Sequence, residues 1–248
     1  ELVSADNAIA IALEASRQLK DNELNVLMKG LQSLSETPIQ CWWKAGKNGQ
    51  FQQLGEGAGE LYLKVSGKLK FCFEPGQFIQ VNGEINTKMV DQMLRLVSPS
   101  SSGVAVDLFC GAGNLSLPLT RQFDQVIGIE GLESLVAGAA KNAIENKITT
   151  AQFFTADLTQ RNSLNKIKQI PKSLDLVVLD PPRSGALDIM PWIAKSGAKQ
   201  VIYISCHPAT MARDAKYLLD AGYKIKDLGV LDMFPHTAHV EAMALFEK

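Results

Sequence analysis

The sequence predicts an α/β fold in which a mostly parallel, doubly wound sheet of seven strands ends in an antiparallel hairpin, after a small α+β region. Three observations lead to this prediction. Strand-like apolar runs alternate with helical patterns from about residue 87 onward, which is the order that builds a parallel sheet covered on both faces. The last two runs, 223–233 and 239–246, are joined by five residues, too few for a helical crossover. Hydrophobic residues make up 46% of the 248 and charged residues 21%, which supports a large core and excludes a disordered chain.

Residues 1–75 are predicted to form the small α+β region. Large side chains alternate at positions 9, 11 and 13, the period of a strand. Leucines then recur at helical spacing after Asp21, the expected N-cap, and Thr37-Pro38 ends that helix. The other elements expected here are a strand at 39–43, a Gly-rich turn region at 46–59, and two short strands within 61–73 around Ser66-Gly67.

Residues 76–248 are predicted to form the larger domain. A helix at 87–97 leads into five buried strands with helical crossovers. Such sheets bind ligands at the carboxyl ends of their strands, so residues that follow each strand are the first candidates for a site. The strands are expected at 104–109, 125–130, 152–156, 174–179 and 201–205.

A glycine turn after the first of these strands predicts a nucleoside-cofactor site. Gly111 and Gly113 let the backbone approach a ligand, and the helix expected at 115–121 offers free N–H groups. Ser116 replaces the third glycine of the dinucleotide fingerprint, which disfavours a nicotinamide oxidoreductase. Glu130 ends the next strand and can accept both hydroxyls of a ribose, a group that NAD and S-adenosylmethionine share.

Two aspartates close the third and fourth strands and are site candidates by position. For Asp157 the alternative is a helix N-cap ahead of Leu158. Asp180 begins Asp180-Pro181-Pro182-Arg183, where two prolines fix the backbone and make an ordinary loop a poorer interpretation.

Cys206 is the candidate nucleophile. It follows the fifth strand and precedes a helix expected at 209–221, whose N-terminus should favour the thiolate. A buried structural cysteine is the alternative, and it is the preferred interpretation for Cys41 and Cys72; Cys110 should pack beneath the cofactor. The cysteine spacing contains no zinc motif and no dense disulfide framework, so we expect no metal site and a reducing, cytoplasmic location.

Glu241 opens the last strand on the face opposite Val240 and Ala242, and is either a base or merely solvated. His236 and His239 flank the same connection. Each could act as a base or a hydrogen-bond donor, although a structural role is commoner.

Six ordered motifs together resemble the RNA uracil-5-methyltransferases over about residues 61–248. Within that family, the last motif is most similar to bacterial members that act on 23S ribosomal RNA rather than on transfer RNA. The resemblance implies a Rossmann-like class I S-adenosylmethionine-dependent methyltransferase fold. The motifs are Phe78–Asn82, Asp107–Asn114, Gly128–Glu130, Asp180–Gly185, Ser205–Asp214 and Leu231–Glu241.

The resemblance makes Cys206 the nucleophile and Glu241 the base. This chain departs from the family pattern at Pro182, where the family often has a small residue, and at His207, where it usually has Asn. His207 leaves the nucleophile intact but puts nearby RNA contacts in doubt. Full-length members also carry an N-terminal RNA-binding domain of the OB type and often an iron–sulfur cluster, so we expect a C-terminal portion with part of a central RNA-binding domain at 1–75. The residues expected to bind S-adenosylmethionine are Gln80, Phe109, Gly111, Gly113, Asn114, Glu130, Asp157 and Asp180.

The expected reaction is methylation of carbon 5 of uridine, which needs a thiolate to add to carbon 6 first. RNA is the expected partner, and no membrane or obligate protein partner is indicated; the formal charge of −1 neither favours nor excludes nucleic acid. Three alternatives remain: the same chemistry on transfer RNA, methylation of an exocyclic amine, and an RNA-binding scaffold without turnover. The amine reaction usually wants an aromatic residue where Arg183 stands, and it leaves Cys206 unused.

Overall fold

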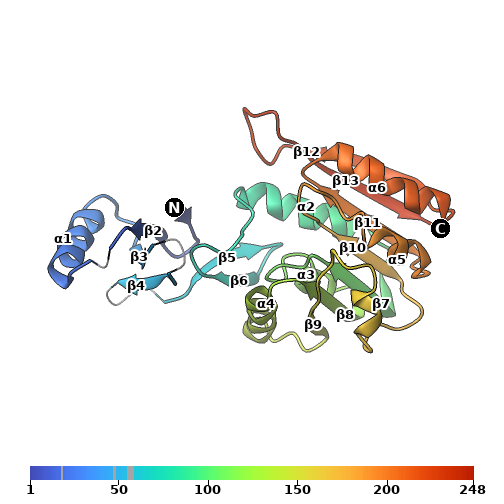
Figure 1. Cartoon of the computed structure of the whole chain (residues 1–248), viewed down its shortest axis with the longest axis horizontal. Helices are drawn as coiled ribbons and strands as arrows, with labels where there is room; N and C mark the ends of the chain where they lie inside the picture. Colours follow the sequence, from blue (N-terminus) through green and yellow to red (C-terminus); the bar gives the residue numbers. More distant parts are fainter. Residues whose placement is uncertain (18, 47–48, 55–58) are drawn as a thin grey trace. The chain divides into compact units, whose positions relative to one another are not determined.

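The computed structural model describes residues 1–17, 19–46, 49–54 and 59–248. By its internal contacts the chain divides into two compact units, Glu1–Lys64 with Lys70–Ile79, and Val65–Leu69 with Gln80–Lys248 (Figure 1). None of the helices in the described part is long and apolar enough to cross a membrane.

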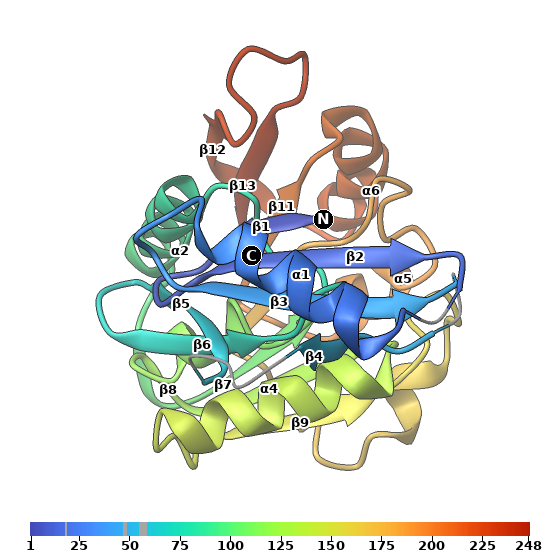
Figure 2. The same cartoon turned by 90° about the vertical axis from the view of Figure 1, so that its left-hand side faces the viewer.

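The first unit contains a four-stranded sheet in the order β1-β2-β3-β4, a helix and a hairpin. Strands β2 and β3 are parallel because helix α1 connects them, and α1 packs against β3 (Figure 2). A small core is formed by Ala8 and Ala10 with Leu61 and Phe73 of the hairpin β5–β6. The elements are β1 (Leu2–Ser4), β2 (Ile9–Ala15), α1 (Asp21–Gln32), β3 (Ile39–Ala45), β4 (Gln52–Leu54), β5 (Leu61–Val65) and β6 (Leu69–Phe73).

Two local expectations for this unit were wrong. Lys20, not Asp21, is the N-cap of α1, and its backbone N–H donates to the Glu23 carboxylate at 2.9 Å. Strand β4 lies inside the stretch expected to be only a turn region, of which residues 47–48 and 55–58 lie outside the described residues. This strand is three residues long, too short to show a period.

The second unit is a seven-stranded sheet in the order β12-β13-β11-β10-β7-β8-β9. Strands β11, β10, β7, β8 and β9 are parallel, and β13 runs antiparallel to both β11 and β12. The predicted terminal hairpin is therefore confirmed. The strands are β7 (Ser100–Leu108), β8 (Phe123–Glu130), β9 (Ala151–Thr155), β10 (Leu176–Leu179), β11 (Gln200–Ser205), β12 (Lys224–Leu231) and β13 (Glu241–Glu247).

Helices cover both faces of this sheet, as the alternating pattern predicts. Helices α5 and α6 pack together over one face, where their apolar side chains join those of the central strands in one core. Helix α2 starts at Gly83, four residues before the expected start, because the Asn82 side chain caps it by accepting from the Ile85 N–H at 3.1 Å. The helices are α2 (Gly83–Leu96), α3 (Ser116–Leu119), α4 (Glu133–Glu145), η1 (Ser163–Lys166), α5 (Met190–Lys195) and α6 (Pro208–Asp220).

The topology gathers the chemically active residues at one edge of the sheet. Strands β7, β8, β10 and β11 are parallel, so the residues after each of them meet at their shared carboxyl edge. Strand β13 runs the opposite way, so its first residue, Glu241, reaches the same edge.

Candidate active site

Strand register places Cys206 beside Glu241. Ser205 is paired with Ala242 across β11 and β13, so the residue after Ser205 and the residue before Ala242 lie at the same end of the two strands. Cys206 is half-buried and Glu241 is buried. The interpretation of Glu241 as a solvated surface residue is therefore wrong. The fold thus brings a thiol and a carboxyl group to one place, although the two residues are 35 positions apart in the sequence.

Asp180 is the third group of this cluster. It follows β10, the neighbour of β11, and its half-buried carboxylate accepts a long hydrogen bond of 3.4 Å from the Gln80 side chain. Two residues expected at the cofactor site are thus in contact although 100 positions separate them.

Burial makes the two carboxyl groups unusually hard to ionise. It raises the pKa of Asp180 to about 6. It raises the pKa of Glu241 to about 7, with a further contribution from the charge of Asp180. A carboxyl group with a pKa near 7 is suited to accept a proton at neutral pH.

The thiolate of Cys206 is disfavoured in this structure, contrary to the expectation from its place before a helix. Burial raises the Cys206 pKa first, and the carboxylates of Glu241 and Asp180 raise it further, while Arg183 lowers it. The helix N-terminus gives little help because Pro208 has no N–H, and the Thr210 N–H donates to His207 Nδ1 at 3.4 Å.

The glycine turn after β7 has the conformation that its glycines predict. Gly111 and Gly113 have φ of +53° and +96°, and Phe109 also has a positive φ, of +63°. A Cβ added at Gly111 would meet nothing within 4 Å, whereas one at Gly113 would lie 3.3 Å from Leu117 Cγ. The turn is therefore packed beneath Gly113 and open over Gly111.

Glu130 is held against this turn by backbone groups. One carboxylate oxygen accepts from the Gly111 N–H at 3.2 Å, and the other accepts from Gly131 at 2.7 Å and Leu132 at 3.1 Å. These bonds fix the carboxylate beside the glycine turn, and its remaining lone pairs can still accept from a ligand.

Asn114 is paired with a residue that the sequence analysis did not single out. The side-chain amides of Asn114 and Asn86 donate to each other at 2.9 Å, and Asn86 is buried on α2. The available signal was an asparagine on the same helical face as the buried Met89, Val90 and Met93.

Asp107 was also missed as a site residue. It is fully buried in β7, where Oδ2 accepts a short hydrogen bond from the Ser116 hydroxyl and Oδ1 has no partner among the described residues. Burial raises its pKa to about 7, and the charges of Asp180 and Glu130 add to the shift. The signal was a lone carboxylate within an apolar strand.

Asp157 differs from the other predicted site residues. Its exposed carboxylate accepts from the Thr159 N–H at 2.9 Å, the Thr159 hydroxyl at 2.6 Å and the Gln160 side chain at 2.8 Å. These bonds lower its pKa. They form a turn rather than the start of a helix, so the N-cap alternative was wrong.

The other cysteines and the two histidines near the end of the chain differ in their exposure. Cys41, Cys72 and Cys110 are buried, and Cys110 Sγ lies beneath the glycine turn. His236 and His239 are exposed in the connection between β12 and β13, where the His239 ring makes an edge contact with Phe234. Within the described ranges no cluster of side chains could hold a metal ion.

Comparison with known proteins gives a consistent family. The model of the family described as tRNA (Uracil-5-)-methyltransferase matches residues 3–248. The chain is 41% identical over 248 residues to the 23S rRNA (uracil(1939)-C(5))-methyltransferase RlmD of Vibrio parahaemolyticus, covering all of this chain and 54% of that protein. It is 40% identical over 241 residues to RlmD of Pseudomonas fluorescens, covering 97% and 52%. The chain thus spans about half the length of the curated relatives it matches.

Solved structures show the fold independently. A Pyrococcus abyssi tRNA (uracil-54, C5)-methyltransferase in complex with S-adenosyl-L-homocysteine superposes with a TM-score of 0.77 and 23% identity, over 96% of this chain and 56% of that one. The M. jannaschii tRNA m1G37 methyltransferase gives a TM-score of 0.65 at 10% identity, over 100% and 71%. The predicted class I methyltransferase fold is confirmed.

Proposed function

The chain belongs to the tRNA (uracil-5-)-methyltransferase family, and on that premise we propose that the protein methylates carbon 5 of a uridine in 23S ribosomal RNA. The identity to two RlmD proteins over nearly the whole chain supports this substrate. The observation that carries the proposal is the pairing of β11 with β13, which brings the Cys206 thiol and the buried Glu241 carboxyl group to one edge of the sheet.

The residues at this edge fit S-adenosylmethionine as the methyl donor. The charges of Asp180 and Glu130 both act on Asp107, and Asp107 Oδ1 has no partner among the described residues. A positively charged ligand relieves such a cluster. The ribose would be held by Glu130 beside the open turn at Gly111, and Gln80, Asn114 and Asp180 would complete the pocket. We keep Phe109, Gly113 and Asp157 as further contacts.

In the proposed mechanism Cys206 activates the uracil ring for methylation. Its thiol proton leaves to solvent, its sulfur bonds to carbon 6, and the electrons of the C5–C6 double bond move onto the ring as an enolate. When bound, S-adenosylmethionine supplies a methyl group on a positively charged sulfur, which carbon 5 takes.

Glu241 completes the reaction. Carbon 5 then carries both a methyl group and a proton, and the Glu241 carboxylate removes the proton. The released electrons restore the C5–C6 double bond as the bond between carbon 6 and Cys206 breaks. Since the pKa of Glu241 is about 7, a large fraction of the groups is ionised and ready at neutral pH.

RNA recognition is shared between parts of the protein in this proposal. The target atom is unreachable inside a helix, so the uridine must lie in a loop or be flipped out. We assign residues 1–75 to RNA binding and 76–248 to catalysis. Because bacterial ribosomes are assembled in the cytoplasm, we place the protein there.

The proposal is tested by methyl transfer to transcripts of 23S ribosomal RNA and of transfer RNA, using labelled S-adenosylmethionine and both this chain and the full-length protein. We expect label in 5-methyluridine from the ribosomal transcript and none with Cys206→Ala. Label only in transfer RNA would mean that transfer RNA, not ribosomal RNA, is the substrate. Label in a methylated exocyclic amine, or no label with the full-length protein, would overturn the proposal.

A further inference from the structure

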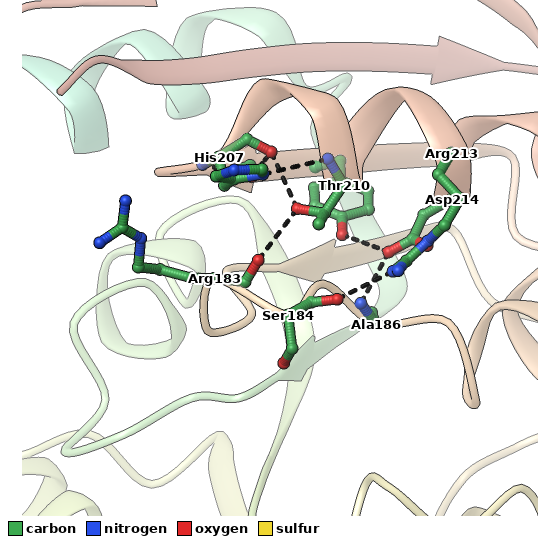
Figure 3. Close-up of polar contacts among 9 residues, drawn as sticks. Arg183, Ser184, Ala186, His207, Thr210, Arg213 and Asp214 are labelled. Carbon is green, nitrogen blue, oxygen red and sulfur yellow. Dashed lines mark hydrogen bonds and ion pairs between the residues drawn. The ribbon is translucent and has the colours of Figure 1, made fainter. Parts of the chain in front are cut away.

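Side chains on the first two turns of helix α6 form hydrogen bonds with the loop that follows Asp180 (Figure 3). The Thr210 hydroxyl lies 2.8 Å from the carbonyl of His207 and 3.3 Å from that of Arg183, so its one proton is shared between them. Arg213 Nη2 donates to the carbonyl of Ser184 at 2.9 Å. The helix that begins next to Cys206 is thus bonded to the backbone of the Asp180–Gly185 motif.

Asp214 joins helix α6 to the loop and to strand β11 through its buried carboxylate. It is fully buried, and Oδ2 accepts from the Ala186 N–H and the Tyr203 hydroxyl, both at 2.7 Å. Oδ1 accepts from Arg213 Nε at 2.8 Å. Burial and the bond to Asp214 raise the pKa of Tyr203, so its hydroxyl stays a donor. A buried carboxylate persists only when paired in this way. We call Thr210, Arg213 and Asp214 the α6 clamp.

The loop has a glycine where it crosses the α6 clamp. Gly185 has φ of +80°, and a Cβ there would lie 2.5 Å from Asp214 Oδ2 and 2.6 Å from Arg213 Nη2. No other residue allows the backbone to approach so closely. Sequence, backbone conformation and hydrogen bonds therefore all hold this loop in one position.

What the loop carries is Arg183. In Figure 3 its side chain points away from the α6 clamp, and it is exposed. The groups that act on Cys206 are Glu241 from β13, Asp180 from the end of β10 and Arg183 from the loop, and Arg183 is the positive one. His207, the N-cap of α6, adjoins Cys206 in the chain.

We propose that Arg213 and Asp214 are positioning residues that hold the backbone of the loop at Arg183 in one place, so that the Arg183 charge stays near Cys206. Their side chains bond to each other and to the backbone of the loop. Resting on the proposed function, this assigns them a part in the addition of Cys206 to carbon 6, because a fixed guanidinium offsets the two carboxylates that oppose the thiolate. If the loop were not held, the distance between the Arg183 charge and Cys206 would vary, and the effect of that charge on the thiolate would fall.

The test measures the reactivity of Cys206 without RNA. Iodoacetamide alkylates the thiolate, which displaces iodide while the thiol proton goes to the buffer. The rate is followed from pH 6 to 10 by mass spectrometry of the peptide containing Cys206, which separates it from the buried cysteines. The variants are Arg213→Met, Arg183→Met and the double variant, with Arg213→Lys as the conservative change. The matched control is Lys216→Met, since Lys216 lies on α6 but pairs with the exposed Asp220 at 2.7 Å.

We expect Arg213→Met and Arg183→Met each to shift the midpoint of the profile upward by about 0.5 pH unit. The double variant should shift it no further than Arg183→Met alone, because Arg213 acts through Arg183. Arg213→Lys should fall between Arg213→Met and the wild type, and Lys216→Met should match the wild type. Thermal unfolding checks that each variant is folded, and Thr210→Val, with a smaller shift of the same sign, replaces Arg213→Met if that variant is not.

An unchanged midpoint in Arg213→Met, or additive shifts in the double variant, would overturn the proposal. The outcome is separate from that of the methylation assay. If methyl transfer fails but the midpoint shifts are found and are not additive, the proposed function is wrong and the role of the α6 clamp stands. If methyl transfer occurs but the shifts are absent or additive, only the role of the clamp is wrong.

Discussion

Single carboxyl groups in and beside the central strands are held where ionisation is unfavourable. Burial raises the pKa of Asp107 and of Glu241 to about 7 and that of Asp180 to about 6. Such shifts reduce the stability of the folded chain at neutral pH, and they gather at functional sites. These shifts fit the proposed function, in which carboxyl groups at this edge of the sheet would face a positively charged ligand and take part in a proton transfer.

Replacement of Glu241 should stabilise the protein in a pH-dependent way. The folded pKa of about 7 lies above the ordinary value of 4.5, so both states hold the proton below pH 4.5. As pH rises from 4.5 to 7 the unfolded state releases it first, so wild-type stability falls and stays lower above pH 7. We expect Glu241→Gln to be more stable than wild type by about 1–3 kcal/mol at pH 8 and nearly equal near pH 4.5.

Urea unfolding at both pH values measures this difference. Glu84→Gln is the control, since Glu84 is exposed, its bond to Lys88 lowers its pKa, and its removal should not stabilise the chain at pH 8. A stability gain for Glu241→Gln that is the same at both pH values would show that shape, not charge, is responsible.

Asp107 should determine whether the cofactor site prefers a positive charge. Asp107→Asn keeps the shape and removes the charge, so we expect the preference for S-adenosylmethionine over its neutral product S-adenosylhomocysteine to fall about tenfold. Isothermal titration with both ligands gives the ratio, with the exposed Asp220→Asn as a control. Equal weakening of both ligands would instead mean that Asp107 only supports the turn.

At the scale of elements, long strands and the glycine turn could be predicted because their signals are local. The apolar runs of β7, β8, β10 and β11 and the spacing of Gly111 and Gly113 predict the sheet edge and its turn. The pairing of Asn86 with Asn114 could not be predicted, because α2 and the turn meet only after folding. The same holds for Asp214, because two of its three partners, Tyr203 and Ala186, lie 11 and 28 positions away.

The two glycines of the turn should differ in their tolerance of a side chain. Gly111 lies in the left-handed region with open space around it, so Gly111→Ala should destabilise the protein by about 1 kcal/mol. Gly113→Ala should cost about 2–3 kcal/mol, because its φ of +96° suits few residues and its Cβ meets Leu117. Thermal unfolding of the two variants measures the order, and a Gly111 variant less stable than the Gly113 variant would contradict this account of the turn.

At the scale of the whole molecule, the α/β class and the antiparallel terminal hairpin follow from the residue pattern. The joint roles of Cys206 and Glu241 are implied by the family resemblance. The ionisation of Cys206 follows from neither, because it depends on carboxylates supplied by β10 and β13. Likewise the short strands β1 and β4 take their form from pairing with β2 and β3 rather than from their own residues.

The most direct test of the central claim is a covalent adduct with RNA. A 23S ribosomal RNA fragment containing 5-fluorouridine is incubated with the protein and S-adenosylmethionine and run on a denaturing gel. Fluorine cannot leave carbon 5 as a proton does, so the bond from Cys206 to carbon 6 should persist. We predict a cofactor-dependent adduct that is lost in Cys206→Ala. The Glu241→Gln variant should still form it, because the Glu241 carboxylate acts only after the bond to carbon 6 and the methyl transfer. Methylated RNA without an adduct, or an adduct that survives Cys206→Ala, would contradict the account.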